Sequence, residues 1–173
     1  MLRPIILLLA CLLIAVPHVE AKTGPRTKVA VGDMPPDYLG KNDTGGDILA
    51  SALRGKVVVV TFWATWCGPC LLELPVLQSI REQVSEDRLA IVAINYGQGK
   101  RIYRKILERT PDWTLTFAYD PWQRAAKAFG VTGLPHMFII DKQGKVASVH
   151  MGYGEETLAA LVGELNTYLT AKP

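Results

Sequence analysis

The spacing of apolar and polar residues divides most of the chain into alternating strands and helices. Two runs, Val57 to Phe62 and Leu89 to Asn95, are almost continuously apolar, which is typical of strands buried on both faces of a parallel sheet. Apolar residues recur at helical spacing from Cys67 to about Val84 and from Lys100 to Arg109, which predicts two helices. The inward face of the first helix is expected to carry Leu71, Leu74, Leu77 and Ile80.

The C-terminal half continues this alternation. A short strand is expected over Leu115 to Tyr119, followed by a helix from about Pro121 to Phe129. Two strands, Met137 to Ile140 and Lys145 to His150, flank a turn that ends in glycine, which is the pattern of a β-hairpin. A helix over Glu155 to Leu169 closes the chain. These elements predict an α/β fold with a partly antiparallel sheet.

The N-terminal residues have a different character. Arg3 precedes the uncharged run Ile5 to Val16, and the small residue Ala21 follows shortly after it. This order describes a secretory signal peptide, and the run is shorter than the roughly 18–20 residues that a membrane-spanning helix needs. We expect residues 1–21 to be a signal peptide, with an uncleaved anchor as the alternative. Residues 22–36 are then a polar tail, and residues 37–173 form one domain that begins with a small hairpin.

Composition narrows the class of protein. Hydrophobic residues make up 49% of the chain, charged residues 20%, and the formal net charge is +3. These values are typical of a globular domain and give no reason to expect a nucleic-acid partner. Removal of residues 1–21 would leave Cys67 and Cys70 as the only thiols. A disulfide between residues this close constrains the unfolded chain only weakly, so a purely structural role explains them poorly.

The strongest chemical signal is Cys67-Gly68-Pro69-Cys70, which follows the first buried strand and opens a helix. A thiol at a helix N-terminus lies beside unpaired backbone N–H groups, which favour the thiolate and lower its pKa. Cys67 is therefore the expected nucleophile. Pro69 suits the first helical turn, where a missing N–H is tolerated. Cys70, one turn further on, would resolve the mixed disulfide.

Half a zinc site is the main alternative for two cysteines at this spacing. A structural zinc ion needs four ligands, and no second cysteine pair follows. The spacing of His136 and His150 does not match a zinc finger. We therefore expect no metal and no cofactor other than a redox-active Cys67–Cys70 disulfide.

The segment from Val57 to Cys70 resembles the active-site region of thioredoxin-like proteins, and in particular that of the TlpA/ResA group of exported, often membrane-tethered oxidoreductases. The resemblance extends over roughly Gly32 to Leu169. It implies a thioredoxin-like fold, with a central mixed sheet flanked by helices, an N-terminal hairpin extension and an αβ insertion near residues 97–111. Further segments that match the group are Leu53 to Lys56, Glu73 to Pro75, Val131 to Pro135 and Phe138 to Asp141.

The resemblance also implies roles for individual residues. Pro135 would follow a cis peptide bond, and the carbonyl of Leu134 before it would help to bind an extended substrate. Trp66 would flank the disulfide and shape the docking surface. Glu73 matches an acid of the group that exchanges a proton with the cysteines, the alternative being a surface helix acid. Thr61 stands where plain thioredoxin has a buried aspartate.

His136 departs from the group, which more often has a small polar residue after the proline. A solvated or packed histidine is the favoured interpretation of this residue. His150, at a strand end, is interpreted as structural.

The resemblance implies that the chain would be a dithiol reductant of cysteine pairs in exported client proteins, for example in cytochrome c maturation. It would be supplied by a membrane electron donor, in the bacterial periplasm or at the outer face of the cytoplasmic membrane. It would contact the membrane itself only through an uncleaved N-terminal segment. A disulfide-inserting oxidant and a copper-handling module remain alternatives. A peroxide reductase is disfavoured because Ala64 stands where peroxiredoxins need a threonine.

Overall fold

The computed structural model describes residues 28–172. The predicted signal peptide and the first part of the predicted tail lie outside this range. Within it, one mixed sheet has the strand order β2-β1-β5-β4-β3-β6-β7. The strands are β1 (Tyr38–Lys41), β2 (Asp47–Leu49), β3 (Val57–Trp63), β4 (Leu89–Tyr96), β5 (Thr116–Asp120), β6 (His136–Ile140) and β7 (Val146–Met151).

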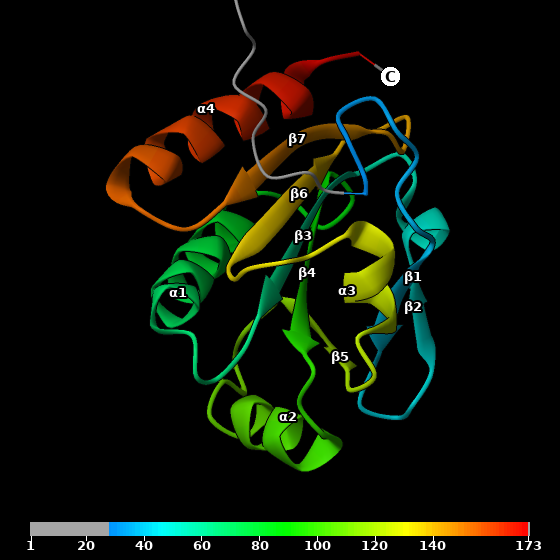
Figure 1. Ribbon diagram of the computed structural model, residues 1–173. Coiled ribbons are helices and arrows are strands. Elements are labelled where there is room, and N and C mark those ends of the chain that lie inside the picture. Colours follow the sequence, from blue (N-terminus) through cyan, green and yellow to red (C-terminus); the bar gives the residue numbers. More distant parts are fainter. Residues whose placement is uncertain (1–27, 173) are drawn as a thin grey trace, which may run out of the picture.

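The helices cover both faces of this sheet (Figure 1). They are α1 (Gly68–Gln83), α2 (Lys100–Leu107), α3 (Arg124–Phe129) and α4 (Glu155–Thr170), with a short 3-10 helix η1 (Ala50–Leu53). Apolar side chains of α1, α2 and α4 form one core cluster with one face of the sheet, and those of α3 form a second cluster with the other face. The predicted mixed sheet flanked by helices is confirmed.

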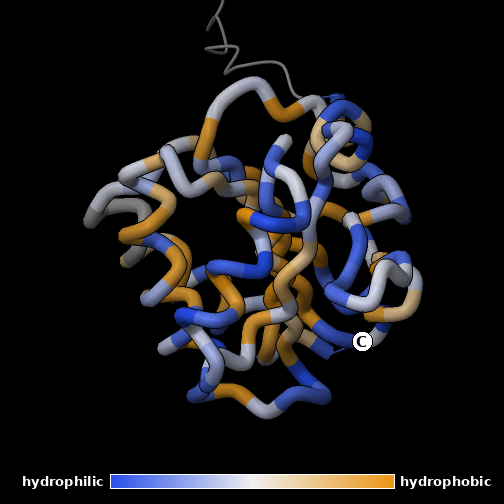
Figure 2. The backbone as a smooth tube through the Cα atoms, turned by 90° about the horizontal axis from the view of Figure 1, so that it is seen from below, coloured by the Kyte–Doolittle hydropathy of each residue, from blue (hydrophilic) through white to orange (hydrophobic). Residues whose placement is uncertain are grey.

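Strand β3 lies at the centre of the fold, and all seven of its residues are buried. It pairs in parallel with β4 and antiparallel with β6, and β4 pairs in parallel with β5. The carboxyl ends of β3, β4 and β5 therefore meet at one edge of the sheet, the lower edge in Figure 1. Figure 2, which shows the backbone from below, has many hydrophobic segments in the interior and many hydrophilic segments towards the outside.

Most predicted elements are present, with differences at their ends. The expected helix from Pro121 begins only at Arg124, because Gln123 has a left-handed backbone with φ 57°. Asp120 then accepts hydrogen bonds from the backbone N–H groups of Arg124 and Ala126, at 2.8 and 3.0 Å, and so caps the helix. Helix α2 ends at Leu107 rather than at the expected Arg109.

The predicted N-terminal hairpin is formed by β1 and β2, which pair antiparallel. The part of the expected polar tail that the structure describes is held on the domain. Val29 is buried in the core cluster beside α3, and the backbones of Gly32 and Asp33 exchange hydrogen bonds with Val146 at 2.8 and 2.9 Å. Within residues 28–172, no helix is long and apolar enough to cross a membrane.

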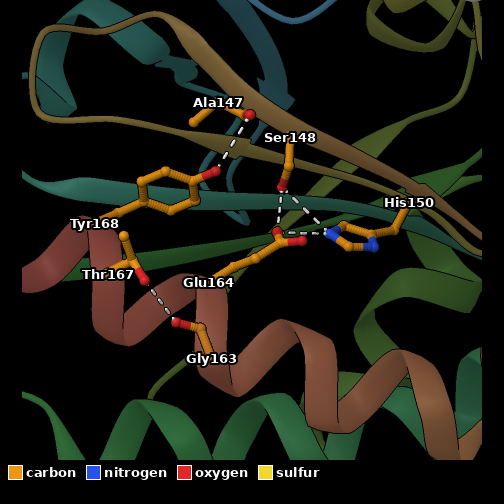
Figure 3. A network of polar contacts seen from close by, with 7 residues as sticks. All are labelled: Ala147, Ser148, His150, Gly163, Glu164, Thr167 and Tyr168. Atoms are coloured by element: carbon orange, nitrogen blue, oxygen red, sulfur yellow. Dashed lines mark hydrogen bonds and ion pairs between the residues drawn. The ribbon is translucent and has the colours of Figure 1, made fainter.

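Helix α4 is fixed to strand β7 by a small polar network (Figure 3). Oε2 of Glu164 accepts hydrogen bonds from Oγ of Ser148 at 2.6 Å and lies 2.9 Å from Nε2 of His150. The hydroxyl of Tyr168 donates to the carbonyl of Ala147 at 3.3 Å. These contacts support the structural interpretation of His150.

Candidate active site

The two cysteines lie at the junction of β3 and α1, as the sequence predicts. The backbone N–H of Cys67 donates to the carbonyl of Ala64 at 3.1 Å, which closes a tight turn after the strand. Cys67 is the N-cap of α1, and its Sγ accepts a hydrogen bond from the N–H of Cys70 at 3.3 Å. A disulfide joins Cys67 to Cys70.

This position has electrostatic consequences for the sulfur atoms. Gly68 and Pro69 are exposed in the first turn of α1, where a proline is tolerated because its missing N–H has no helical partner. The remaining N–H groups and the helix dipole favour a negative charge on the sulfur of Cys67. Cys67 has 5% of its surface exposed and Cys70 has none. Only Cys67 is therefore open to attack from solvent in the oxidised protein.

Glu73 lies one turn beyond Cys70, and the structure buries it. Its exposed fraction is 1%, and its Oε1 accepts a hydrogen bond from the hydroxyl of Thr61 at 2.6 Å. Oε2 has no hydrogen-bond partner among the described residues. Burial raises the pKa of Glu73 from 4.5 to about 7, and the hydrogen bond from Thr61 opposes this rise. Glu73 is therefore not a surface helix acid.

Two residues close to the cysteines in the sequence have exposed apolar side chains. Trp66, directly before Cys67, is 67% exposed, and Leu72, two residues after Cys70, is 65% exposed. Apolar surface of this kind is typical of sites that contact other proteins.

The loop before β6 belongs to the same edge of the sheet, because β6 starts beside the end of β3. The Leu134–Pro135 peptide bond is cis, as the resemblance implies. Leu134 is half-buried and Pro135 is buried. The carbonyl of Pro135 accepts a hydrogen bond from Gly152 at 2.9 Å, which ties the loop to the end of β7.

His136 is packed, which is one of the two forms expected for it. It lies opposite Phe62 on β3 and stacks on Phe138, with ring centroids 4.6 Å apart. Phe62 and Phe138 belong to the core cluster on the α3 side, whereas the disulfide and Leu74 of α1 belong to the other cluster. Burial lowers the pKa of His136 to about 4, so the ring is neutral at physiological pH.

One contact of the site was not foreseen from the sequence. Gln98, in the loop between β4 and α2, hydrogen-bonds both the backbone N–H and the hydroxyl of Thr65, two residues before Cys67. The parallel register of β3 and β4 brings these residues together. Among the described residues, no group of three or more histidine, cysteine or acidic side chains is arranged to hold a metal ion.

Comparisons with known proteins place these features in context. The family model described as AhpC/TSA matches residues 31–149. The thiol-disulfide oxidoreductase ResA of Geobacillus thermodenitrificans is 36% identical over 129 residues, which cover 73% of this chain and 72% of ResA. ResA of Bacillus cereus is 29% identical over 163 residues, which cover 94% of this chain and 92% of ResA.

Solved structures show the same likeness. A protein from Chlorobium tepidum, assigned as the thiol:disulfide interchange protein DsbE, superposes with a TM-score of 0.76 at 31% identity. The match covers 82% of this chain and 99% of that protein.

Proposed function

Because the chain belongs to the AhpC/TSA family, has a thioredoxin-like fold and is a ResA-like thiol–disulfide oxidoreductase, we propose that it reduces disulfides in exported client proteins. The observation that carries this proposal is the Cys67–Cys70 disulfide at the start of α1, with the carboxyl of Glu73 buried one turn further along. Protein thiols and disulfides are its substrates. In this proposal the Cys67–Cys70 disulfide serves as the redox group, and the reaction needs no metal or other cofactor.

The reaction uses the two cysteines in turn. In the reduced protein, the thiolate of Cys67 attacks a client disulfide, forms a mixed disulfide and releases one client thiolate. Cys70 then attacks the sulfur of Cys67, which releases the second client thiolate and forms the Cys67–Cys70 disulfide. The client gains two electrons and the protein loses two. A membrane-bound dithiol donor must return these electrons by the same exchange chemistry.

Glu73 serves as the proton acceptor for the resolving step. Cys70 is fully buried, so its thiol cannot lose its proton directly to solvent. Glu73 lies three residues further along α1, and residues at this spacing share one face of a helix. A carboxyl whose pKa is about 7 is partly ionised at neutral pH and can both take and return a proton. Thr61 orients this carboxyl through its hydroxyl.

The client binds across the apolar surface beside the disulfide. Trp66 supplies an exposed indole face, and the backbone of Leu134, before Pro135, supplies hydrogen-bonding groups for an extended client segment. Main-chain contacts accept many sequences. Such a surface suits a reductant that acts on several clients.

Reduction, rather than disulfide insertion, is favoured by the residues between the cysteines. Gly68 and Pro69 resemble the reducing thioredoxin type, whereas strong oxidants usually carry a histidine before the second cysteine. The leader pattern of residues 1–21 supports export to the periplasm or the outer face of the cytoplasmic membrane. Likeness to relatives named thiol-disulfide oxidoreductase supports clients that carry a reducible disulfide. The example that we propose, from the resemblance to the TlpA/ResA group, is apocytochrome c before haem attachment.

The order of attack can be tested by trapping the intermediate. Reduced Cys70→Ala protein that lacks residues 1–21, and with them Cys11, is mixed with a peptide that contains one disulfide, and the products are separated without reductant. A stable mixed disulfide through Cys67 is expected, because the resolving thiol is absent. The matched Cys67→Ala variant should form almost none, since Cys70 is buried. Equal trapping by the two variants would refute the assigned roles.

A further inference from the structure

The turn that leads into the active site is held by a side chain from a neighbouring loop. Oε1 of Gln98 accepts a hydrogen bond from the backbone N–H of Thr65 at 2.9 Å, and Nε2 of Gln98 donates to the hydroxyl of Thr65 at 2.8 Å. Nδ2 of the fully buried Asn95 also donates to Oε1 of Gln98 at 2.9 Å. We call this arrangement the amide clamp. It engages both ends of the Gln98 amide and fixes the orientation of that group.

The fold explains why Gln98 reaches this turn. Asn95 is paired with Trp63 in the parallel register of β4 and β3, so the two strands end side by side. The chain then reverses at Gly97, whose φ is 66°. This left-handed conformation favours glycine, and a Cβ here would lie 2.9 Å from Nε2 of Gln123. The reversal directs the next side chain back towards β3.

The clamp acts on the residues that present the nucleophile. Thr65 and Trp66 are the two middle residues of the turn that the hydrogen bond from Cys67 to Ala64 closes. A fixed Thr65 therefore restricts both the exposed indole of Trp66 and the peptide that leads into Cys67. The stabilisation of a thiolate by a helix N-terminus depends on this geometry, since Sγ must stay near the N–H of Cys70.

We propose that Gln98 is a positioning residue for thiol–disulfide exchange: through Thr65 it holds Trp66 and Cys67 in the orientation that favours the thiolate and client docking. Among the described residues, Gln98 makes no hydrogen bond to the sulfur of Cys67 or Cys70. It acts through the turn. This inference rests on the proposed function, and its test must separate the two.

The chain contains a matched control for the clamp. Gln78 on α1 makes the same two contacts with another threonine: its Oε1 accepts from the backbone N–H of Thr114 at 2.9 Å, and its Nε2 donates to the hydroxyl of Thr114 at 3.3 Å. Gln78 lies two turns beyond Cys70 and holds the loop before β5. Gln98→Met and Gln78→Met therefore remove the same kind of contact, one at the active-site turn and one elsewhere.

The experiment compares these variants with the wild-type protein in two assays. Alkylation by iodoacetamide of the reduced protein without residues 1–21, which contain Cys11, is followed across pH and reports the pKa and reactivity of the Cys67 thiolate, because Cys70 is buried. Reduction of a disulfide-containing peptide reports kcat and KM. We expect Gln98→Met to move the alkylation midpoint to higher pH and to slow peptide reduction about tenfold, which is less than the roughly 100-fold that a 1 Å misplacement of reacting groups can cost. Gln78→Met should keep the wild-type profile in both assays.

Two further variants keep the test decisive if Gln98→Met does not fold. Thr65→Val removes only the contact between the hydroxyl and Nε2 and should give a smaller change of the same sign. Gln98→Glu keeps acceptors for the N–H of Thr65 and for Asn95, so it should approach wild-type rates at high ionic strength, where its added charge is screened.

The two claims fail in different ways. Identical alkylation profiles and reduction rates for the Gln98 and Gln78 variants would overturn the positioning role. A wild-type protein that alkylates normally but does not reduce the peptide would instead overturn the proposed function, and the alkylation profiles would still test the clamp.

Discussion

Replacing Glu73 by glutamine should remove a pH dependence of stability that comes from one buried carboxyl. Burial raises the pKa of Glu73 from 4.5 to about 7 in the folded protein, so the folded state binds this proton more tightly than the unfolded chain. The resulting stabilisation is fully present below about pH 4.5 and is lost as the pH rises through about 7. The loss is about 3 kcal/mol, because each pH unit between the two pKa values corresponds to about 1.4 kcal/mol.

The assay is urea unfolding of the oxidised wild-type and Glu73→Gln proteins between pH 4.5 and pH 8. The quantity to follow is the difference in free energy of unfolding between the two proteins. His136 titrates in an overlapping pH range and changes the stability of both proteins in the opposite direction. Glutamine keeps an oxygen acceptor for the hydroxyl of Thr61 but carries no ionisable proton. As the pH rises from 4.5 to 8, the free energy of unfolding of the variant should therefore increase by about 3 kcal/mol relative to that of the wild-type protein.

A surface acid provides the control for this measurement. Glu108 is exposed at the end of α2, and Glu108→Gln should follow the wild-type curve closely. Parallel curves for the wild-type and Glu73→Gln proteins would refute the argument, because they would mean that the carboxyl of Glu73 titrates alike in the folded and unfolded states.

Two other changes have defined outcomes. His136→Phe keeps the stacking on Phe138 and removes a ring whose pKa burial lowers to about 4. The stability that the neutral histidine contributes is present above about pH 6.5 and is lost as the pH falls towards 4. In urea unfolding the variant should therefore gain stability relative to the wild-type protein at pH 4.5 compared with pH 7.5, and an equal effect at both pH values would contradict this. Glu164→Ala removes the acceptor shared by Ser148 and His150 and should lower the free energy of unfolding by about 1 kcal/mol. The expected readout is a lower Tm with an unchanged rate of peptide reduction. An unaltered Tm would show that the attachment of α4 does not depend on this network.

The sequence predicted the elements well because their signals are local. The apolar run of β3 and the motif from Cys67 to Cys70 each specify their conformation without reference to distant residues. The inward face of α1 was predicted less well. Leu71 was expected to face the core and is 44% exposed, whereas Glu73 is buried. Leucines at positions 71, 72 and 74 allow two apolar stripes, and only the packing of α1 on the sheet decides between them.

The polar contacts of the site could not be predicted because they depend on tertiary structure. The hydrogen bond between Thr61 and Glu73 requires α1 to lie against β3, and the contact of Gln98 with Thr65 requires the register of β3 and β4. The late start of α3 depends on Asp120, whose side chain bonds the backbone beyond a left-handed Gln123. The contacts of Glu73 with Thr61 and of Gln98 with Thr65 join groups that no local pattern connects, whereas Asp120 caps backbone groups only four and six residues further along the chain.

The reduction potential of the Cys67–Cys70 couple tests the central claim most directly. Protein that lacks residues 1–21 is equilibrated with a dithiothreitol or glutathione series, and the redox state is followed by tryptophan fluorescence, with Trp66 beside the disulfide as the expected reporter. The account predicts a potential of about −250 mV or lower, near that of thioredoxin, which suits a reductant supplied by a membrane donor. A value near about −120 mV, like that of the oxidant DsbA, would contradict it and assign the protein to disulfide insertion.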